Sequence, residues 1–194
     1  MRGRFITLEG LEGVGKTTNR QCVADWLAEC GIEFVVTREP GGTPLGESLR
    51  QLVLSAEGQM QGETELLLMA ASRVEHVARV IEPALASGRW VLCDRFLDAS
   101  IAYQGAGRQL GVERVAELHR LMGVTLEPDL TLLLDMPVAD GLARMAQRGS
   151  PDRIERETLA FFERVREAYL RCAGAAPERV KVVDAAQPLE TVQA

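Results

Sequence analysis

The sequence is poor in asparagine and in lysine, and each shortage excludes something. Asn19 is the only asparagine and Arg20 follows it, so the N-K-x-D motif with which GTPases read guanine is absent. A D-x-x-G switch motif is absent as well. Lys16 and Lys181 are the only lysines, so arginine supplies nearly all the cationic side chains. Arginine suits bidentate contacts to phosphate, but codon bias explains most of the excess, so only the position of an arginine is informative.

Cysteine pairs and long apolar runs are also missing. The cysteines are scattered without a C-x-x-C pair, which predicts reduced thiols, no metal cage and a cytoplasmic location. No apolar run approaches the roughly 18 residues of a membrane-spanning helix, and no signal-peptide pattern opens the chain. Because the formal net charge is -6 and the pI is near 5.1, we expect neither a nucleic acid nor a membrane surface as a partner.

The strongest positive signal is a glycine-rich stretch that fits the P-loop pattern G-x-x-x-x-G-K-[ST] at every defined position. Glycines let the backbone wrap a phosphate closely and turn successive N–H groups onto it. We expect Lys16 to reach the β- and γ-phosphates of ATP and the Thr17 hydroxyl to hold Mg²⁺. A chance glycine-rich turn is the alternative, but the apolar run before it and the helix-compatible segment after it are the context the motif requires. The predicted ATP-binding loop is Gly10, Leu11, Glu12, Gly13, Val14, Gly15, Lys16, Thr17 and Thr18.

Apolar runs alternate with helix-compatible segments along the whole chain. This alternation predicts one α/β domain over residues 1–194, with a five-stranded parallel sheet flanked by helices. A long helix over 63–86 carries more than one apolar stripe, which predicts burial on two sides and a homodimer, and Pro83 is expected to kink it. The strands are predicted at 5–8, 34–36, 90–93, 130–134 and 180–183, and the other helices at 17–30, 46–54, 114–122, 139–147, 155–172 and from 188.

The chain length and the placement of arginines favour a small kinase over other P-loop proteins. Phosphoryl transfer to a phosphate acceptor needs alignment and positive charge rather than a general base, because the attacking oxygen is already largely ionised. Arg38 and Arg95 follow the second and third predicted strands, at the sheet edge where ligands bind in open α/β sheets. Arg50 lies on the helix that follows. Asp94 closes the third strand, where it either helps to hold Mg²⁺ or caps the next helix.

Four motifs, in this order and spacing, make the chain resemble the bacterial thymidylate kinases. They are the P-loop stretch, the segment from Arg38 to Thr43, Asp94-Arg95-Phe96, and the segment from Ala102 to Gly105. The resemblance runs from about Phe5 to Leu189 and covers nearly the whole chain. It implies a three-layer P-loop kinase fold and the ATP-dependent conversion of dTMP to dTDP, with Mg²⁺.

The resemblance also implies which residues bind dTMP. Arg73 and Gln104 would read the thymine edge, which offers a carbonyl and an N–H to an arginine donor and an amide. Glu12 would lie near the deoxyribose, and Tyr103 would lie against the sugar and favour a deoxy over a ribo substrate, unless it is only a packed core aromatic. Three arginines would surround the acceptor phosphate. The full predicted set is Glu12, Arg38, Glu39, Pro40, Arg50, Met69, Arg73, Arg95, Ser100, Tyr103 and Gln104.

Met69 departs from the family pattern, which commonly places a phenylalanine four residues before the base-reading arginine. The i, i+4 spacing still puts Met69 and Arg73 on one helix face. A methionine sulfur can cover a base, with weaker stacking than an aromatic ring. The alternative is that Met69 is simple core packing.

A Gly/Ser/Pro segment from Arg148 to Arg153 has the composition of a mobile lid, predicted at about 147–155. Some thymidylate kinases carry an arginine in the P-loop where this chain has Gly13, so the resemblance implies that the lid supplies the catalytic cation. Arg153 and Arg148 are therefore assigned to the transferring phosphoryl group, beside Lys16 and Arg95, and Arg144 to the adenine. A solvated basic loop is the alternative, because acidic residues lie nearby.

Two other functions stay open at this point. One is a kinase for another nucleoside monophosphate. The other is a non-catalytic P-loop module, which predicts ATP binding without acceptor-dependent release of ADP. The hypothesis of a non-catalytic module does not explain Glu12 or the arginines at the strand ends.

Overall fold

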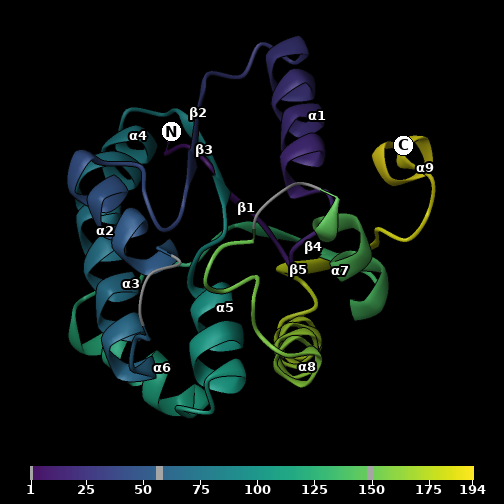
Figure 1. Cartoon of the computed structure of the whole chain (residues 1–194). Coiled ribbons are helices and arrows are strands. Elements are labelled where there is room, and N and C mark those ends of the chain that lie inside the picture. The colour runs from purple at the N-terminus through teal and green to yellow at the C-terminus, as the bar shows by residue number, and fades with distance from the viewer. Residues whose placement is uncertain (1, 56–58, 148–150) are drawn as a thin grey trace.

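One sheet of five parallel strands forms the centre of the computed structural model, which describes residues 2–55, 59–147 and 151–194 (Figure 1). The strands lie in the order β2-β3-β1-β4-β5. Each predicted strand is present and longer by one or two residues, so the predicted α/β fold is confirmed. The bounds are β1 (Phe5–Gly10), β2 (Phe34–Arg38), β3 (Trp90–Asp94), β4 (Leu130–Asp135) and β5 (Val180–Asp184).

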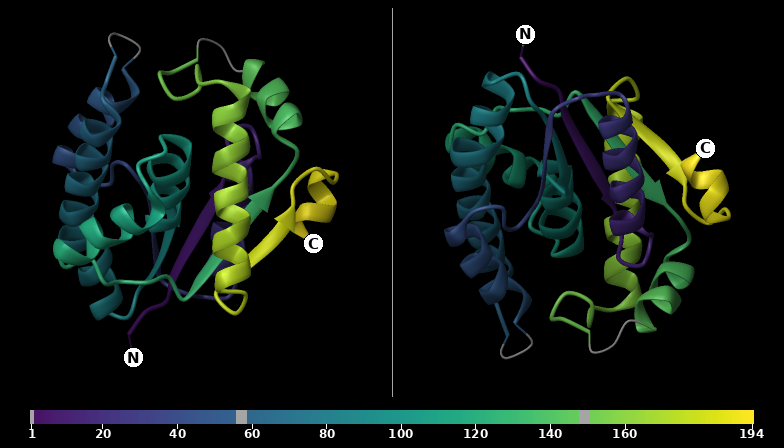
Figure 2. Two further views of the ribbon diagram at one scale, coloured as in Figure 1. Left: turned by 90° about the horizontal axis from the view of Figure 1, so that it is seen from below. Right: turned by 90° about the horizontal axis from the view of Figure 1, so that it is seen from above.

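Helices cover both faces of the sheet. Figure 2 shows the molecule from two opposite sides, with α8 in front of the sheet in one view and α1 in front in the other. None of the helices within the described ranges is long and apolar enough to cross a membrane. The helices are α1 (Lys16–Glu29), α2 (Pro44–Leu54), α3 (Gly62–His76), α4 (Glu82–Ala86), α5 (Leu97–Ser100), α6 (Val112–Leu121), α7 (Val138–Ala146), α8 (Leu159–Ala175) and α9 (Leu189–Gln193), with π-helical turns η1 (Val77–Ile81) and η2 (Ile101–Gly107).

Side chains of the central strands alternate between two apolar clusters. Phe5 and Val91 pack with the helical segment η1–α4 on one face, whereas Ile6 and Leu92 pack against α1 on the other. A further cluster joins α8 to β4. Successive strand residues point to opposite faces, so burial of both faces explains why the strands read as continuous apolar runs.

The predicted helix over 63–86 is α3, η1 and α4 in succession. Its regular hydrogen bonding is interrupted at η1, where the N–H of Glu82 donates to the carbonyl of Val77. Pro83, which has no N–H to donate, lies in the first turn of α4. The interruption that the sequence places at Pro83 therefore takes the form of a π-helical turn just before it.

Two differences from prediction concern α8 and η2. The last long helix begins at Leu159 rather than 155, because the Thr158 side chain caps it by accepting from the N–H of Phe161 (3.2 Å). No helix is predicted over 97–107, where glycine lowers helix propensity. Packing overrides that preference in η2, since a Cβ at Gly107 would lie 2.6 Å from the Phe161 ring.

Candidate active site

Glycine is required at three positions between the last residue of β1 and the start of α1. Gly10, Gly13 and Gly15 have φ values of 135°, 76° and 90°, which side chains rarely tolerate. A Cβ on Gly13 would stand 2.0 Å from the carbonyl oxygen of Gly141 in α7. The loop therefore has no room for an arginine side chain at position 13.

Lys16 folds back over this loop. Its Nζ donates to the carbonyls of Leu11 (2.6 Å) and Gly10 (3.1 Å), which holds the ammonium group at the N-terminus of α1. Burial and the neighbouring Arg95 lower the pKa of Lys16 to about 8. Both the helix terminus and the crowded cations favour an anion at this point.

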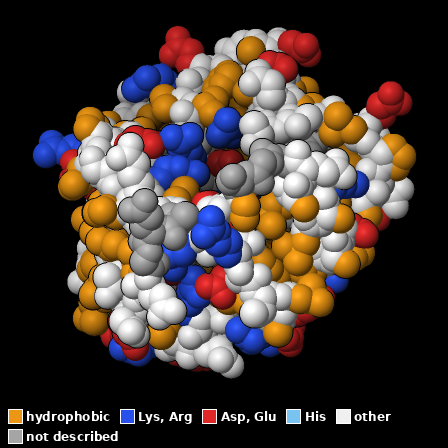
Figure 3. All heavy atoms as spheres, viewed as in Figure 1, with side chains coloured by type: hydrophobic (Ala, Val, Ile, Leu, Met, Phe, Trp, Pro, Cys, Tyr) orange, Lys and Arg blue, Asp and Glu red, His pale blue; other side chains and the backbone are white. Residues whose placement is uncertain are grey.

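Four cationic side chains line one cleft beside the loop. Lys16, Arg38, Arg50 and Arg95 come from α1, the end of β2, α2 and the end of β3. The cleft encloses about 950 Å³, counting the solvent at its mouth, and Figure 3 shows Lys and Arg side chains gathered at this hollow. Burial and the charge of Arg38 lower the pKa of Arg50. In a chain of net charge -6, such a concentration of positive charge indicates a site for phosphates.

Arg95 is fixed in the cleft by acidic and aromatic neighbours. Its Nη2 donates to Glu12 Oε1 (2.7 Å), its Nη1 donates to the Tyr169 hydroxyl (3.2 Å), and its guanidinium lies over the Tyr103 ring at 4.7 Å. The Tyr103 hydroxyl donates to the other oxygen of Glu12 (2.6 Å). Arg95 adopts a φ of 71°, a strained value of the kind found at functional sites. Burial works against the charge of Glu12, but Arg95 and Lys16 lower its pKa, so Glu12 is a paired carboxylate.

Arg73 lies directly behind the cleft and is fully buried. It donates to Glu39 (2.6 Å), Ser100 (2.9 Å), the Phe96 carbonyl (2.8 Å) and Nε2 of His119 (2.6 Å). Burial and Arg73 lower the pKa of His119 to about 4, which keeps the imidazole neutral and able to accept. These contacts engage Arg73 inside the protein, so its predicted contact with a base stays a prediction.

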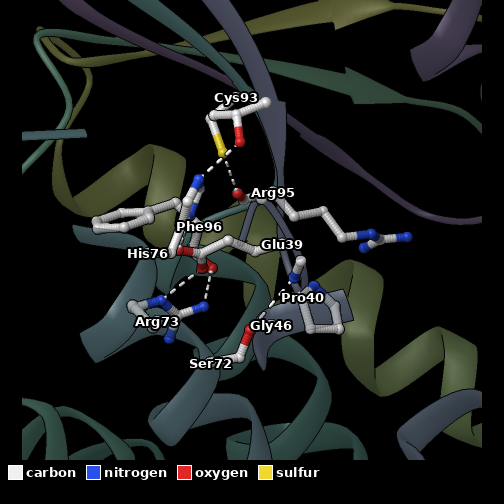
Figure 4. Close-up of polar contacts among 12 residues, drawn as sticks. Glu39, Pro40, Gly46, Ser72, Arg73, His76, Cys93, Arg95 and Phe96 are labelled. Atoms are coloured by element: carbon white, nitrogen blue, oxygen red, sulfur yellow. Dashed lines mark hydrogen bonds and ion pairs between the residues drawn. The ribbon is translucent and has the colours of Figure 1, made fainter. Parts of the chain in front are cut away.

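Glu39 joins Arg73 to the end of β2. His76 contacts Oε1 of Glu39 through Nδ1 (2.9 Å) and the Thr37 hydroxyl through Nε2 (2.6 Å). Figure 4 shows Arg73 and His76 turned toward the Glu39 carboxylate, whereas Arg95 extends away from this group. The peptide bond between Glu39 and Pro40 is cis, and both residues line the cleft.

Thr17 and Asp94 fit a magnesium ion. Both line the cleft, and Arg20 lies 3.9 Å from one oxygen of Asp94. The other oxygen, Oδ1, is buried without a hydrogen-bond partner in the described parts of the chain. No group of three His, Cys, Asp or Glu side chains that could hold a metal occurs among the described residues. One hydroxyl and one carboxylate suit Mg²⁺, which in nucleotide sites takes its other ligands from phosphates and water.

Sequence comparison decides the family. The sequence profile of the family described as Thymidylate kinase matches residues 8–194. The chain belongs to the thymidylate kinase family. A curated thymidylate kinase of Pseudomonas entomophila is 58% identical over 194 residues, covering 100% of this chain and 92% of the relative. One of Alkalilimnicola ehrlichii is 58% identical over 193 residues, covering 98% and 89%.

A solved structure of the thymidylate kinase family has a similar fold. The crystal structure of thymidylate kinase from Ehrlichia chaffeensis has a TM-score of 0.78 and 35% sequence identity to this chain. The match covers 95% of this chain and 88% of the crystallised one. The three-layer P-loop kinase fold is thereby confirmed.

A second pocket lies on the other side of the P-loop. Arg144 lines it with Val14 and Thr18 of the loop and with residues 185–189, which follow β5. The pocket encloses about 890 Å³, and Arg144 donates to the Ala185 carbonyl (3.2 Å). The sequence analysis did not predict residues 185–189 as part of the nucleotide site. Their position directly after a strand, at the same sheet edge as the P-loop, was the available signal.

Arg153, the predicted lid arginine that the structure describes, is not among the described residues that line the cleft. Arg153 donates to Glu65 Oε2 (2.6 Å) and to the Val53 carbonyl (2.9 Å), which places its guanidinium against α3 and the end of α2. Arg148 lies outside the described residues. From the same segment, three residues that the prediction missed do line the cleft, namely Asp152, Ile154 and Glu155.

The cleft brings together most of the predicted site. Gly10 and Leu11 hold Lys16 through their carbonyls, and Ser100 lies with Arg73 behind the wall. Leu54 and Ala99 also line the cleft and were not predicted. The predicted residues that line it are Glu12, Gly13, Gly15, Lys16, Thr17, Arg38, Glu39, Pro40, Arg50, Met69, Asp94, Arg95, Tyr103 and Gln104.

Proposed function

We propose that the chain transfers the γ-phosphoryl group of ATP to dTMP, giving ADP and dTDP. The observation that carries this function is the continuity of the P-loop with the arginine-lined end of one cleft, in a member of the thymidylate kinase family. A donor phosphate on the loop and an acceptor phosphate on the arginines would face each other across a short distance, as in-line transfer requires.

The chemistry needs no general base. An oxygen of the dTMP phosphate, largely ionised at neutral pH, attacks the γ-phosphorus while the bond to the oxygen of ADP breaks. Glu12 is paired with Arg95 and Tyr103, so its part is to hold these groups rather than to take a proton. Lys16 and Arg95 would neutralise the charge that develops between donor and acceptor.

The acceptor end of the cleft would hold dTMP by its three chemical parts. Arg38 and Arg50, with Arg95, supply donors for the phosphate. Tyr103 presents its ring to the deoxyribose. The base would lie against Met69 and Gln104, with Arg73 and Ser100 behind them and Glu39 and Pro40 in the adjoining wall.

Mg²⁺ is part of the proposal. Thr17 and Asp94 would hold it, and the bound ion would neutralise phosphate charge. The unpaired buried oxygen of Asp94 supports this role. The second pocket, with Arg144, would take the adenine of ATP.

Arg153, with Arg148, is proposed to reach the transferring phosphoryl group when the segment closes over both nucleotides. Arg153 would have to leave Glu65 to do so. Closure of this kind excludes water and so prevents hydrolysis of ATP.

We further propose a homodimer and a cytoplasmic location. Leu67 and Val74 stand two helical turns apart on α3 with 56% and 37% of their surface exposed, and Leu121 of α6 is 70% exposed. Leu67 and Leu121 line one apolar groove, which a second copy of the chain would cover. The four cysteines are free thiols, as in a reducing compartment.

The test is a coupled assay of ADP formation with dTMP, dUMP, UMP, CMP and GMP as acceptors. We expect dTMP to give the highest kcat/KM. A different best acceptor would reject the specificity and keep the kinase. Binding of ATP without acceptor-dependent ADP would reject the kinase in favour of a binding module.

A further inference from the structure

Glu65 of α3 collects three side chains around one buried carboxylate. Its Oε1 accepts from Nε2 of Gln104 (2.7 Å), and its Oε2 accepts from Nη2 of Arg153 (2.6 Å) and lies 3.0 Å from Nη2 of Arg108. Glu65 itself is fully buried and is not among the described residues that line the cleft. It therefore stands behind Gln104, on the side away from the space for a substrate.

The carboxylate of Glu65 is ionised. Burial opposes the charge, but hydrogen bonds from Arg108, Gln104 and Arg153 and the charge of Arg108 lower its pKa. An ionised carboxylate only accepts hydrogen bonds. Gln104 must therefore turn its NH₂ group toward Glu65. Its carbonyl Oε1, the other branch of the amide, is then directed away from Glu65.

The Oε1 of Gln104 has no partner within the described residues. Gln104 is 1% exposed, and this oxygen is buried and unpaired, although the side chain lines the cleft beside Met69 and Tyr103. A buried acceptor without a donor is costly, whereas a ligand N–H at this place would remove the cost. A ligand acceptor at the same place would be repelled.

We propose that Glu65 is a positioning residue, which locks the Gln104 amide so that the cleft accepts bases with an N–H at ring position 3 and rejects bases with an acceptor there. Thymine and uracil carry the N–H, whereas cytosine has an unprotonated nitrogen. This selection rests on the proposed function, because it takes Gln104 to meet the base.

The experiment measures dissociation constants for dTMP, dUMP and dCMP by calorimetry with the wild-type chain and the Glu65→Gln variant. A glutamine at 65 both donates and accepts, so Gln104 becomes free to turn its amide over. We expect the ratio of the dCMP constant to the dTMP constant to fall at least about tenfold in Glu65→Gln. The dUMP to dTMP ratio should not change, because both bases carry the same N–H.

Arg108→Gln is the matched control. It removes a cation from the same carboxylate but leaves an acceptor-only group beside Gln104, so both ratios should stay as in the wild type. If Glu65→Gln alone does not fold, the double variant Glu65→Gln with Arg108→Gln removes one charge of each sign and should show the same tenfold fall.

Three results would overturn the role of Glu65. They are an unchanged dCMP to dTMP ratio in the folded variant, an equal change in the dUMP ratio, and a wild-type chain that binds dTMP and dCMP equally. Failure of the proposed function has a separate signature, the absence of dTMP-dependent ADP formation by the wild-type chain.

Discussion

The Arg95 guanidinium donates to the Glu12 carboxylate over 2.7 Å, so a P-loop residue fixes a cation that comes from the end of β3. Both side chains are 15% exposed, which limits screening of the pair by water. The nucleotide loop and the acceptor end of the cleft are thus coupled through one ion pair.

Replacing Glu12 by alanine should release Arg95 from its place. We expect kcat/KM for dTMP to fall about 10²-fold, because the cation loses the alignment that phosphoryl transfer requires. The Tyr103→Phe variant is the control: it keeps the ion pair and the ring under Arg95 and removes only the hydroxyl donor. A larger loss in Tyr103→Phe than in Glu12→Ala, read from initial rates of ADP formation, would argue against the ion pair.

The chain's two lysines provide a matched pair of variants. Lys16→Ala should lower kcat by about 10²- to 10³-fold, since the ammonium group at the P-loop is lost. Lys181→Ala should leave the rate unchanged, because Lys181 is exposed and donates to the Pro177 carbonyl, far along the chain from the P-loop. Turnover retained in Lys16→Ala would remove the P-loop from the mechanism.

The sheet and most of the cleft were predictable because their signals are local. Each strand is a short apolar run, and the P-loop and the arginines after β2 and β3 follow directly from the order of residues along the chain. The carboxyl ends of parallel strands meet at one edge, which places these segments together without any knowledge of packing.

The contacts behind the cleft were not predictable, because they join residues far apart in sequence. Glu65 is separated from Gln104 by 39 positions and from Arg153 by 88. Arg73 shares a helix face with Met69, as the spacing predicts, yet its burial depends on partners from other elements, among them His119 of α6. No local pattern encodes such a meeting of side chains.

The raised pKa of Glu9, in β1, predicts how the free energy of unfolding depends on pH. Burial and the Asp98 carboxylate raise the pKa of Glu9 from 4.5 to about 8 in the folded chain. Between these values the folded state holds a proton that the unfolded state has released, so the free energy of unfolding should fall as pH rises through this window. The slope is at most about 1.4 kcal/mol per pH unit.

Urea unfolding of the wild type and of Glu9→Gln from pH 5 to pH 8 measures this effect. The variant should lack the part of the slope that Glu9 supplies. Glu190→Gln, at an exposed position on α9, should keep the wild-type slope. Parallel pH profiles for the wild type and Glu9→Gln would show that Glu9 is not protonated in the native state.

The dimer proposal predicts that charge on α3 separates the subunits. Leu67→Glu with Val74→Glu would place two carboxylates in an interface formed by two copies of the same face, and the chain should sediment as a monomer. Leu159→Glu is the control, because Leu159 is 53% exposed, close to the 56% of Leu67, and belongs to α8 rather than to α3. Equal sedimentation of the wild type and the double variant would place any dimer contact elsewhere.

The role proposed for Arg153 requires its side chain to change partners, because in this structure its guanidinium is bound to Glu65 and to the end of α2. If it reaches the transferring phosphoryl group only in the closed state, Arg153→Ala should lower kcat by at least about tenfold and leave the dissociation constant of dTMP nearly unchanged. Arg156→Ala changes an exposed arginine directly after the predicted lid, which donates to the Pro151 carbonyl, and should change neither quantity. Weaker dTMP binding at an unchanged kcat in Arg153→Ala would assign the residue to support of the base pocket through Glu65 and reject it as the lid cation.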